Sequence, residues 1–262
     1  MLSEKYRDGE TVERLREIYS QEGVVVLEGF LEPDFADGVR EGIAEIQGKN
    51  LWYQVLCGDP SFYDETIDCF SEEGRGCHFA FRYDMFPVCN MPLRSFLAMG
   101  GFTSRRDIRE SLSCLNSEKL RRIAEAPVLE LGAGNALIRL STFLGSDGFA
   151  SLMSSLCSVP SPFLNVTAFV SRFLGGHYLS LHTDGEEGRL CNFVLQLTDF
   201  WLPHWGGDLV LLNYGSRHPE RTFVPQFNSL IIFKVPRPHV VTSVAAVCPK
   251  PRYACSGWVQ KK

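Results

Sequence analysis

The C-terminal part of the chain is a succession of short β-type segments, and this feature limits the fold more than any other. From Asn165 to Val259, alternating or apolar runs are separated by turn residues. The runs read NVTAFVSRF, HYLSLHTD, RLCNFVLQL, GGDLVLLNY, RTFVPQF, SLIIFKV, HVVTSVAAV and RYACSGWV. Eight strand-like runs at this spacing predict a mainly β protein, built as a sandwich or barrel.

Helices are expected mainly before these strands. Apolar residues have helical spacing ahead of Gly23 and again from Pro33 to about Gly48, and residues 23–30 have the β-branched density of a buried strand. Ser146 is placed to cap a further short helix. We expect the helices to cover one face of the sheet. Because no linker or repeat is visible, the prediction is a single domain over residues 1–262, with helical support over about 1–160 and a β core over about 163–260.

Two stretches of the first half are harder to interpret. Residues 49–103 are rich in aromatic residues and broken by Gly and Pro, and they fit either a binding loop or simple packing. A helical stretch follows over about 104–126. Residues 128–136, VLELGAGNA, resemble the first motif of methyltransferases that use S-adenosylmethionine. A lone glycine-rich turn is weak support, and the chain after it lacks the alternating strands and helices of a doubly wound sheet.

Composition excludes several classes of function. A net charge of −5 gives no support for nucleic-acid binding. The N-terminus has no apolar signal region, and the apolar runs are far too short to span a bilayer, so we expect no membrane association. Nine cysteines are scattered without C-x-x-C pairs. This pattern is typical of reduced thiols in a cytoplasmic protein.

A candidate metal site lies within the β region. His182 and Asp184 are one residue apart on a predicted strand, so their side chains should share a face. They are two of the three ligands of a 2-His-1-carboxylate triad, which binds non-haem iron and leaves coordination positions open. His239 begins a later predicted strand and is the candidate third ligand, because strands distant in sequence become neighbours in an antiparallel barrel.

Further polar residues interrupt the apolar strands around this site. Arg252 opens the last predicted strand, where a buried guanidinium needs an anion such as a carboxylate. Tyr178 shares a face with His182. Asn192 and Gln196 fall on the face opposite Phe193 and Leu195. This pattern predicts a lined pocket, since buried polar groups need partners.

Several motifs together carry a resemblance to a known family. They are FRYDMFP at 81–87, HYLSLHTD at 177–184, RLCNFVLQLT at 189–198, HWGGDLVLL at 204–212, PQFNSLIIF at 225–233 and the ending from Arg252 to Trp258. With these motifs the chain resembles the Fe(II)- and 2-oxoglutarate-dependent oxygenases. Within them it is similar to the prolyl 4-hydroxylase-like branch that modifies ribosomal and other translation proteins.

The resemblance implies a fold and a site. The fold would be a double-stranded β-helix (a jelly-roll or cupin-like barrel) with the N-terminal helices packed on one sheet. His182, Asp184 and His239 would bind Fe(II), and Arg252 would bind the distal carboxylate of 2-oxoglutarate. Two positions depart from the family pattern. Phe173 stands where many relatives have a tyrosine, and Ala254 where they have a serine, so Tyr178, Asn192 or Gln196 would supply the missing hydrogen bonds to the co-substrate.

The resemblance also implies an activity. The enzyme would be a dioxygenase that uses Fe(II), 2-oxoglutarate and O2, with ascorbate as a candidate reductant. It would hydroxylate an unactivated C–H bond and release succinate and CO2. A prolyl residue of a protein is the leading substrate. The alternatives are a free amino acid or small metabolite, or a non-catalytic binding or sensing barrel.

Overall fold

The computed structural model describes residues 1–48, 53–57, 81–87, 134–216 and 218–262. Most of the aromatic segment 49–103, the predicted helix at 104–126 and most of the glycine-rich turn at 128–136 lie outside these residues. The helices are η1 Glu4–Tyr6, α1 Gly9–Glu22, α2 Pro33–Gly48, α6 Ala136–Leu144, α7 Asp147–Cys157, η2 Ser161–Phe163 and η3 Pro203–Trp205. The strands are β1 Val24–Glu28, β2 Tyr53–Cys57, β3 Phe81–Pro87, β4 Leu164–Phe173, β5 Tyr178–His182, β6 Arg189–Gln196, β7 Leu209–Leu212, β8 Pro219–Phe223, β9 Ser229–Lys234, β10 His239–Val241 and β11 Arg252–Lys261.

All eight predicted runs between Asn165 and Val259 form strands, so that prediction is confirmed. The strands pair antiparallel in the order β1-β9-β6-β11-β4-β3-β5-β10-β7-β8, and β2 pairs with β3. The fold is mainly β with flanking helices, as expected. The hydrogen-bonded path ends at β1 and β8, so among the described strands the ladder does not close into a complete barrel.

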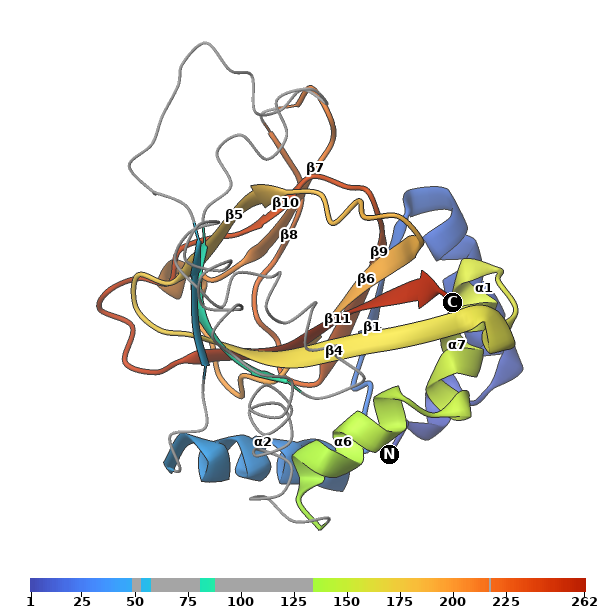
Figure 1. Cartoon of the computed structure of the whole chain (residues 1–262), viewed down its shortest axis with the longest axis horizontal. Coiled ribbons are helices and arrows are strands. Elements are labelled where there is room, and N and C mark those ends of the chain that lie inside the picture. Colours follow the sequence, from blue (N-terminus) through green and yellow to red (C-terminus); the bar gives the residue numbers. More distant parts are fainter. Residues whose placement is uncertain (49–52, 58–80, 88–133, 217) are drawn as a thin grey trace, which may run out of the picture.

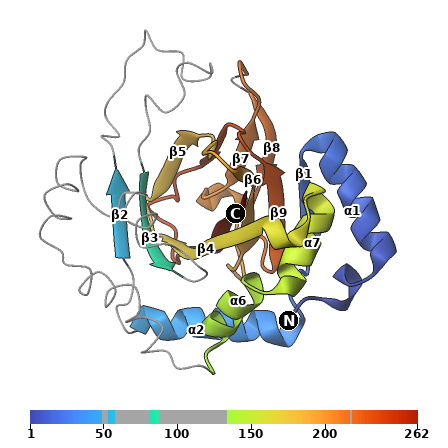
Figure 2. The ribbon, with the colours of Figure 1, turned by 45° about the vertical axis from the view of Figure 1, so that its right-hand side comes forward.

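The helices cover one face of the strands β1, β9, β6, β11 and β4 (Figures 1 and 2). The apolar stripe predicted on α2 is buried there, and its residues are Phe35, Val39, Ile43 and Ile46. Ser146 caps α7 by accepting a hydrogen bond from the backbone N–H of Phe149, as the sequence predicts. The burial of these stripes is the main free-energy contribution that holds the helices on the sheet.

A second apolar cluster fills the space between the two halves of the sheet. It joins the inner face of the helix-covered strands, through residues such as Val194 and Phe233, to Leu209 and Leu211 of β7 and Val241 of β10. Because side chains alternate along a strand, each helix-covered strand contributes one set of residues to the helices and the other set to this interior. The polar residues described next occupy the same interior.

Candidate metal and co-substrate site

The two histidines are held opposite each other on neighbouring strands. His182 at the end of β5 is the direct register partner of His239 at the start of β10. Their ring centroids are 3.9 Å apart, and the ring of Phe233 from β9 packs against His239 at 4.9 Å. The site is therefore built on paired backbone rather than on loops alone.

Both imidazoles present the same nitrogen to the interior. Nδ1 of His182 lies 2.8 Å from the carbonyl oxygen of Ser180, and Nδ1 of His239 lies 2.8 Å from that of Arg237. A carbonyl only accepts, so each Nδ1 carries a proton, and in the neutral form of either ring Nε2 has the free lone pair. Metal-binding histidines are oriented in this way by a hydrogen bond from their other ring nitrogen.

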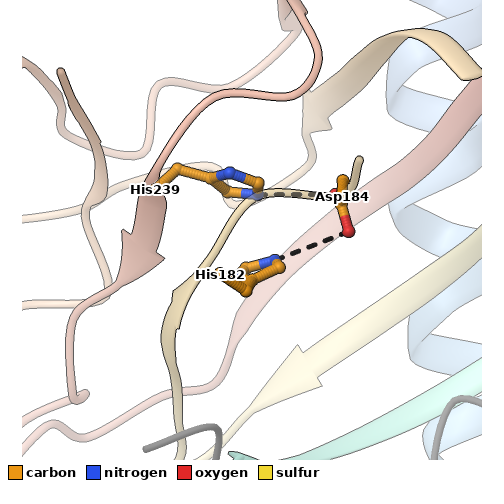
Figure 3. Close-up of side chains that lie close together, drawn as sticks. All are labelled: His182, Asp184 and His239. Atoms are coloured by element: carbon orange, nitrogen blue, oxygen red, sulfur yellow. Dashed lines mark ion pairs between the residues drawn. The ribbon is translucent and has the colours of Figure 1, made fainter. Parts of the chain in front are cut away.

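Asp184 completes the cluster from outside the strand. The sequence predicts Asp184 on the same strand as His182, but β5 ends at His182 and Asp184 has a φ of 54° in the left-handed region. Its carboxylate nevertheless reaches both rings (Figure 3), with Oδ1 3.7 Å from Nε2 of His182 and Oδ2 3.4 Å from Nε2 of His239. A turn rather than strand alternation brings the three residues together.

The three side chains fit a shared ion. Their ligand atoms all lie within 4.8 Å of one another. Two donors that share an ion at about 2.1 Å lie at most about 4.2 Å apart, and both of the nitrogen–oxygen distances from Asp184 fall inside that limit. Two imidazoles and one carboxylate are the donor set of the non-haem Fe(II) triad. The residues present therefore fit the metal.

The electrostatics of the cluster also favour the ligand forms. Burial, helped by the nearby His239, lowers the pKa of His182 to about 4, so this imidazole is neutral near pH 7. Burial by itself would raise the pKa of Asp184. The contacts with His182, His239 and Arg189 outweigh that effect and hold the pKa well below its usual range. Asp184 is therefore a carboxylate at every physiological pH.

Arg252 is buried in the same interior, and it has no anionic hydrogen-bond partner among the residues that the structure describes. It is 1 % exposed, and among the described residues its Nε and Nη2 make no hydrogen bond. Its guanidinium lies over the ring of Phe173 at 5.2 Å. Burial lowers its pKa to about 10, with Asp208 opposing, so it stays charged at pH 7. The carboxylate of a ligand would pair with this buried cation and accept hydrogen bonds from its N–H donors.

Gln196 lies next to the arginine across the strands. It faces Ala254 in the β6–β11 register, and Ala254 is two residues from Arg252 on the same face. Gln196 is fully buried, and both polar atoms of its amide lack a hydrogen bond within the described part of the chain. The sequence prediction that Asn192 and Gln196 face away from Phe193 and Leu195 is confirmed, since those two apolar residues belong to the helix-side cluster.

The other predicted pocket residues lie at different points. Tyr178 begins β5, where it pairs with Arg82 of β3. The amide nitrogen of Asn192 donates to Oδ2 of Asp184 at 2.6 Å, so this residue contacts a candidate ligand rather than the arginine.

Sequence reasoning missed two charged residues. Arg189 lies 3.6 Å from Oδ1 of Asp184. Strict alternation groups it with Cys191, but the β6–β11 register shifts between these two residues. Asp208, whose pKa is raised by burial against the influence of Arg252, stands directly before β7. An acidic residue that follows two glycines and precedes an apolar strand is the signal that could have found it.

Comparison with known proteins finds one family that part of this chain matches. Residues 168–260 match the 2OG-Fe(II) oxygenase superfamily. The matched stretch contains the histidine pair, Asp184 and Arg252, and the resemblance seen in the sequence motifs is confirmed. The name of this superfamily indicates Fe(II) as the metal cofactor and 2-oxoglutarate and O2 as the co-substrates of its members. No curated protein matches the chain by sequence.

Solved structures share the fold at low sequence identity. A prolyl-4-hydroxylase from Pseudomonas putida is 14% identical with a TM-score of 0.50, over 96% of this chain and 99% of that one. A prolyl hydroxylase from Trichoplax adhaerens, in complex with a hypoxia inducible factor peptide fragment, is 15% identical with a TM-score of 0.57, over 98% and 95%. A non-haem alpha-ketoglutarate-dependent epimerase from nogalamycin biosynthesis is 14% identical with a TM-score of 0.52, over 97% and 83%. These likenesses establish the jelly-roll architecture.

Among the described residues, no helix is long and apolar enough to cross a membrane.

Proposed function

We propose that the protein is an Fe(II)- and 2-oxoglutarate-dependent hydroxylase, and that its substrate is a prolyl residue of a protein. One observation carries the proposal: the cluster of His182, Asp184 and His239 faces the same interior as the buried guanidinium of Arg252, whose Nε and Nη2 have no hydrogen-bond partner among the described residues. The match to the 2OG-Fe(II) oxygenase superfamily supports the cofactor chemistry. The prolyl assignment is supported by the two prolyl hydroxylases of the same fold, one of them with a peptide.

The proposed roles follow from the contacts. His182 and His239 would bind Fe(II) through Nε2, and Asp184 would bind it as a carboxylate that also offsets part of the metal charge. Arg252 would bind the distal carboxylate of 2-oxoglutarate through donors that otherwise lack a partner. Gln196 would donate the hydrogen bond for which Phe173 and Ala254 have no hydroxyl. Tyr178 stays a candidate co-substrate residue on β5.

The bound metal would supply the dioxygen-dependent oxidation of a C–H bond, with 2-oxoglutarate converted to succinate and CO2. The chain supplies position and a dry environment. Apolar residues such as Phe233 and Leu211 surround the histidines, which excludes bulk water and strengthens the contacts of the charged groups.

The decisive experiment measures succinate and product mass together. Purified protein is incubated with Fe(II), 2-oxoglutarate, ascorbate and either a library of proline-containing peptides or free amino acids. We expect succinate formation that depends on iron and a peptide whose mass rises by one oxygen on proline. If a free amino acid is oxidised and no peptide is, the substrate is a free amino acid and the prolyl assignment is wrong. Metal binding with no succinate from any substrate would favour a non-catalytic barrel.

Three variants make the test specific. His182→Ala should abolish succinate formation, whereas His218→Ala, which removes an exposed histidine outside the site, should not. Arg252→Met should weaken the binding of 2-oxoglutarate by about 10- to 100-fold, because hydrogen bonds to a charged group contribute about 1.5–3 kcal/mol. Removal of the buried charge favours folding and loss of its attraction for Asp208 opposes it, so we expect only a small change in folded stability. Full activity of His182→Ala would refute the proposal.

A further inference from the structure

The backbone leaves the orientation of Asp184 undetermined. The two histidines lie on β5 and β10, whose pairing fixes their positions. Asp184 follows the end of β5 in a left-handed conformation, and its own carbonyl accepts from the N–H of Glu186 in a tight turn. A carboxylate on such a turn can rotate about its side-chain bonds. Its direction toward the two rings therefore depends on side-chain contacts.

Asn192 makes the shortest of these contacts. Its Nδ2 donates to Oδ2 of Asp184 at 2.6 Å, and the residue is 5 % exposed. It stands within β6, where it is paired on one side with Phe233 of β9 and on the other with Trp258 of β11. A residue on a central strand, flanked on both sides, is held more rigidly than the turn that it contacts. The sheet can thus fix the turn through this one amide.

Arg189 supports the carboxylate from a second direction. Its Nη1 lies 3.6 Å from Oδ1 of Asp184, and its Nη2 lies 2.9 Å from Glu186 on the same turn. Its guanidinium lies over the ring of Trp258 at 4.1 Å. Both carboxylate oxygens of Asp184 therefore face a group from β6 as well as a histidine.

We propose that Asn192 is a positioning residue for the metal site, which holds the carboxylate of Asp184 toward both imidazoles, with Arg189 in a supporting role. The inference rests on the proposed function, since it assigns Asn192 to the metal rather than to the co-substrate. An amide suits this role because it donates a hydrogen bond without adding a charge or an anionic ligand. Outer contacts to metal ligands typically change metal affinity by about 10- to 100-fold when they are removed.

Co(II) is the probe, because it is a divalent first-row metal whose affinity for such a site lies next to that of Fe(II) in the usual order and whose absorption reports its coordination. Co(II) affinity is measured by calorimetry, and the visible spectrum is recorded, without 2-oxoglutarate or turnover. For Asn192→Leu, which removes the donor at similar size, we expect about 10- to 100-fold weaker binding and a changed spectrum. The metal-free protein should still unfold in one transition, with a midpoint lowered by no more than the loss of one hydrogen bond to a charged group. Asn192→Ala decides the question if Asn192→Leu does not fold.

Controls separate this inference from the proposed function. Asn165→Leu makes the same exchange at a half-buried position of β4 and should leave Co(II) affinity and spectrum unchanged. His182→Ala gives the Co(II) affinity and the visible spectrum expected when a metal ligand is lost. If the wild-type protein binds no Co(II), the proposed function falls. If the wild type binds Co(II) while both Asn192 variants bind it equally well with the same spectrum, only the positioning role is overturned.

Discussion

At the scale of single residues, the candidate site combines a neutral imidazole with a permanent carboxylate. Burial is what keeps His182 uncharged, and ionic contacts are what keep Asp184 ionised. The two groups respond to burial in opposite ways because only one of them has enough charged and polar partners. A metal ion would therefore meet two ligands, His182 and Asp184, that need no further deprotonation at pH 7.

This arrangement predicts a pH-dependent stability of the metal-free protein. The pKa of His182 is about 4 when folded, against 6.5 as its ordinary value, so between these values the unfolded chain binds more protons. The contribution of His182 is complete above about pH 6.5 and is lost as the pH falls toward 4. We expect a loss of about 2 kcal/mol between pH 7.5 and pH 5.

Urea unfolding in the presence of a chelator measures this loss. The matched variant is His182→Phe, which cannot titrate and should show a clearly smaller difference between the two pH values. An equal pH dependence in both proteins would assign the effect to other groups. Asp184 does not interfere in this range, because its pKa is already lowered from an ordinary value of 3.8.

The residues of the site differ in how far the sequence could predict them. His182 and His239 stand on strands whose alternation is visible in the sequence, and both lie where that pattern places them. Asp184 and Arg189 do not, because a left-handed turn and a register shift decide their direction. Such local irregularities depend on contacts made in the folded state and leave no period in the sequence.

At the scale of elements, β11 is a strand with little room for change. It pairs along its length with β4 and β6, and it carries Arg252 at its start. At Gly257 an added Cβ would lie 2.2 Å from the carbonyl oxygen of Thr167 and 2.5 Å from the ring of Phe193. The backbone of the sheet and a core ring meet at this glycine.

Gly257→Ala should therefore destabilise the fold. Overpacking of this kind typically costs about 1–3 kcal/mol, and a clash with backbone oxygen leaves little room for relaxation. Chemical denaturation measures the change, with Gln260→Ala on the same strand as the control expected to lie close to wild type. If Gly257→Ala unfolds at the same denaturant concentration as the wild type, the prediction is wrong, and β11 and β4 can move apart at this position without loss of stability.

The order of the elements was less predictable than their existence. Helical and strand periods identify α2 and the eight late strands from local sequence alone. The position of β3 is different, because it lies between β4 and β5 and pairs with both. The pairing of Asp84 with Arg172, which also form a partly buried ion pair at 2.7 Å, joins residues far apart in the chain. The spacing of apolar residues along the sequence does not indicate which distant residue will be the partner.

At the scale of the whole molecule, the helix-covered strands contribute to both apolar clusters. On β6, Phe193 packs toward the helices while its neighbour Val194 packs toward the interior of the sandwich. Loss of the helices would expose the outer set of residues and loosen the strands that carry the inner set. The two clusters should therefore not be separately stable.

We accordingly predict a single unfolding transition. Far-UV circular dichroism at 222 nm reports mainly the helices, and tryptophan fluorescence reports mainly the C-terminal β region, where three of the four tryptophans lie (Trp201, Trp205 and Trp258). The two signals should give the same midpoint in guanidinium. A chain that starts at residue 163 should fail to fold alone. Two separate midpoints would instead divide the chain into a helical unit and a β unit.

The direct pairing of His182 with His239 has a consequence for how the protein matures. A slip of one residue between β5 and β10 would turn one imidazole to the opposite face, because strand side chains alternate. Only chains whose strands have joined in the native alignment would then present both nitrogens to an ion. The amount of metal bound during refolding would then measure the number of correctly aligned molecules. Because the ion would bind only these molecules, it would shift the equilibrium from misaligned chains toward the native pairing.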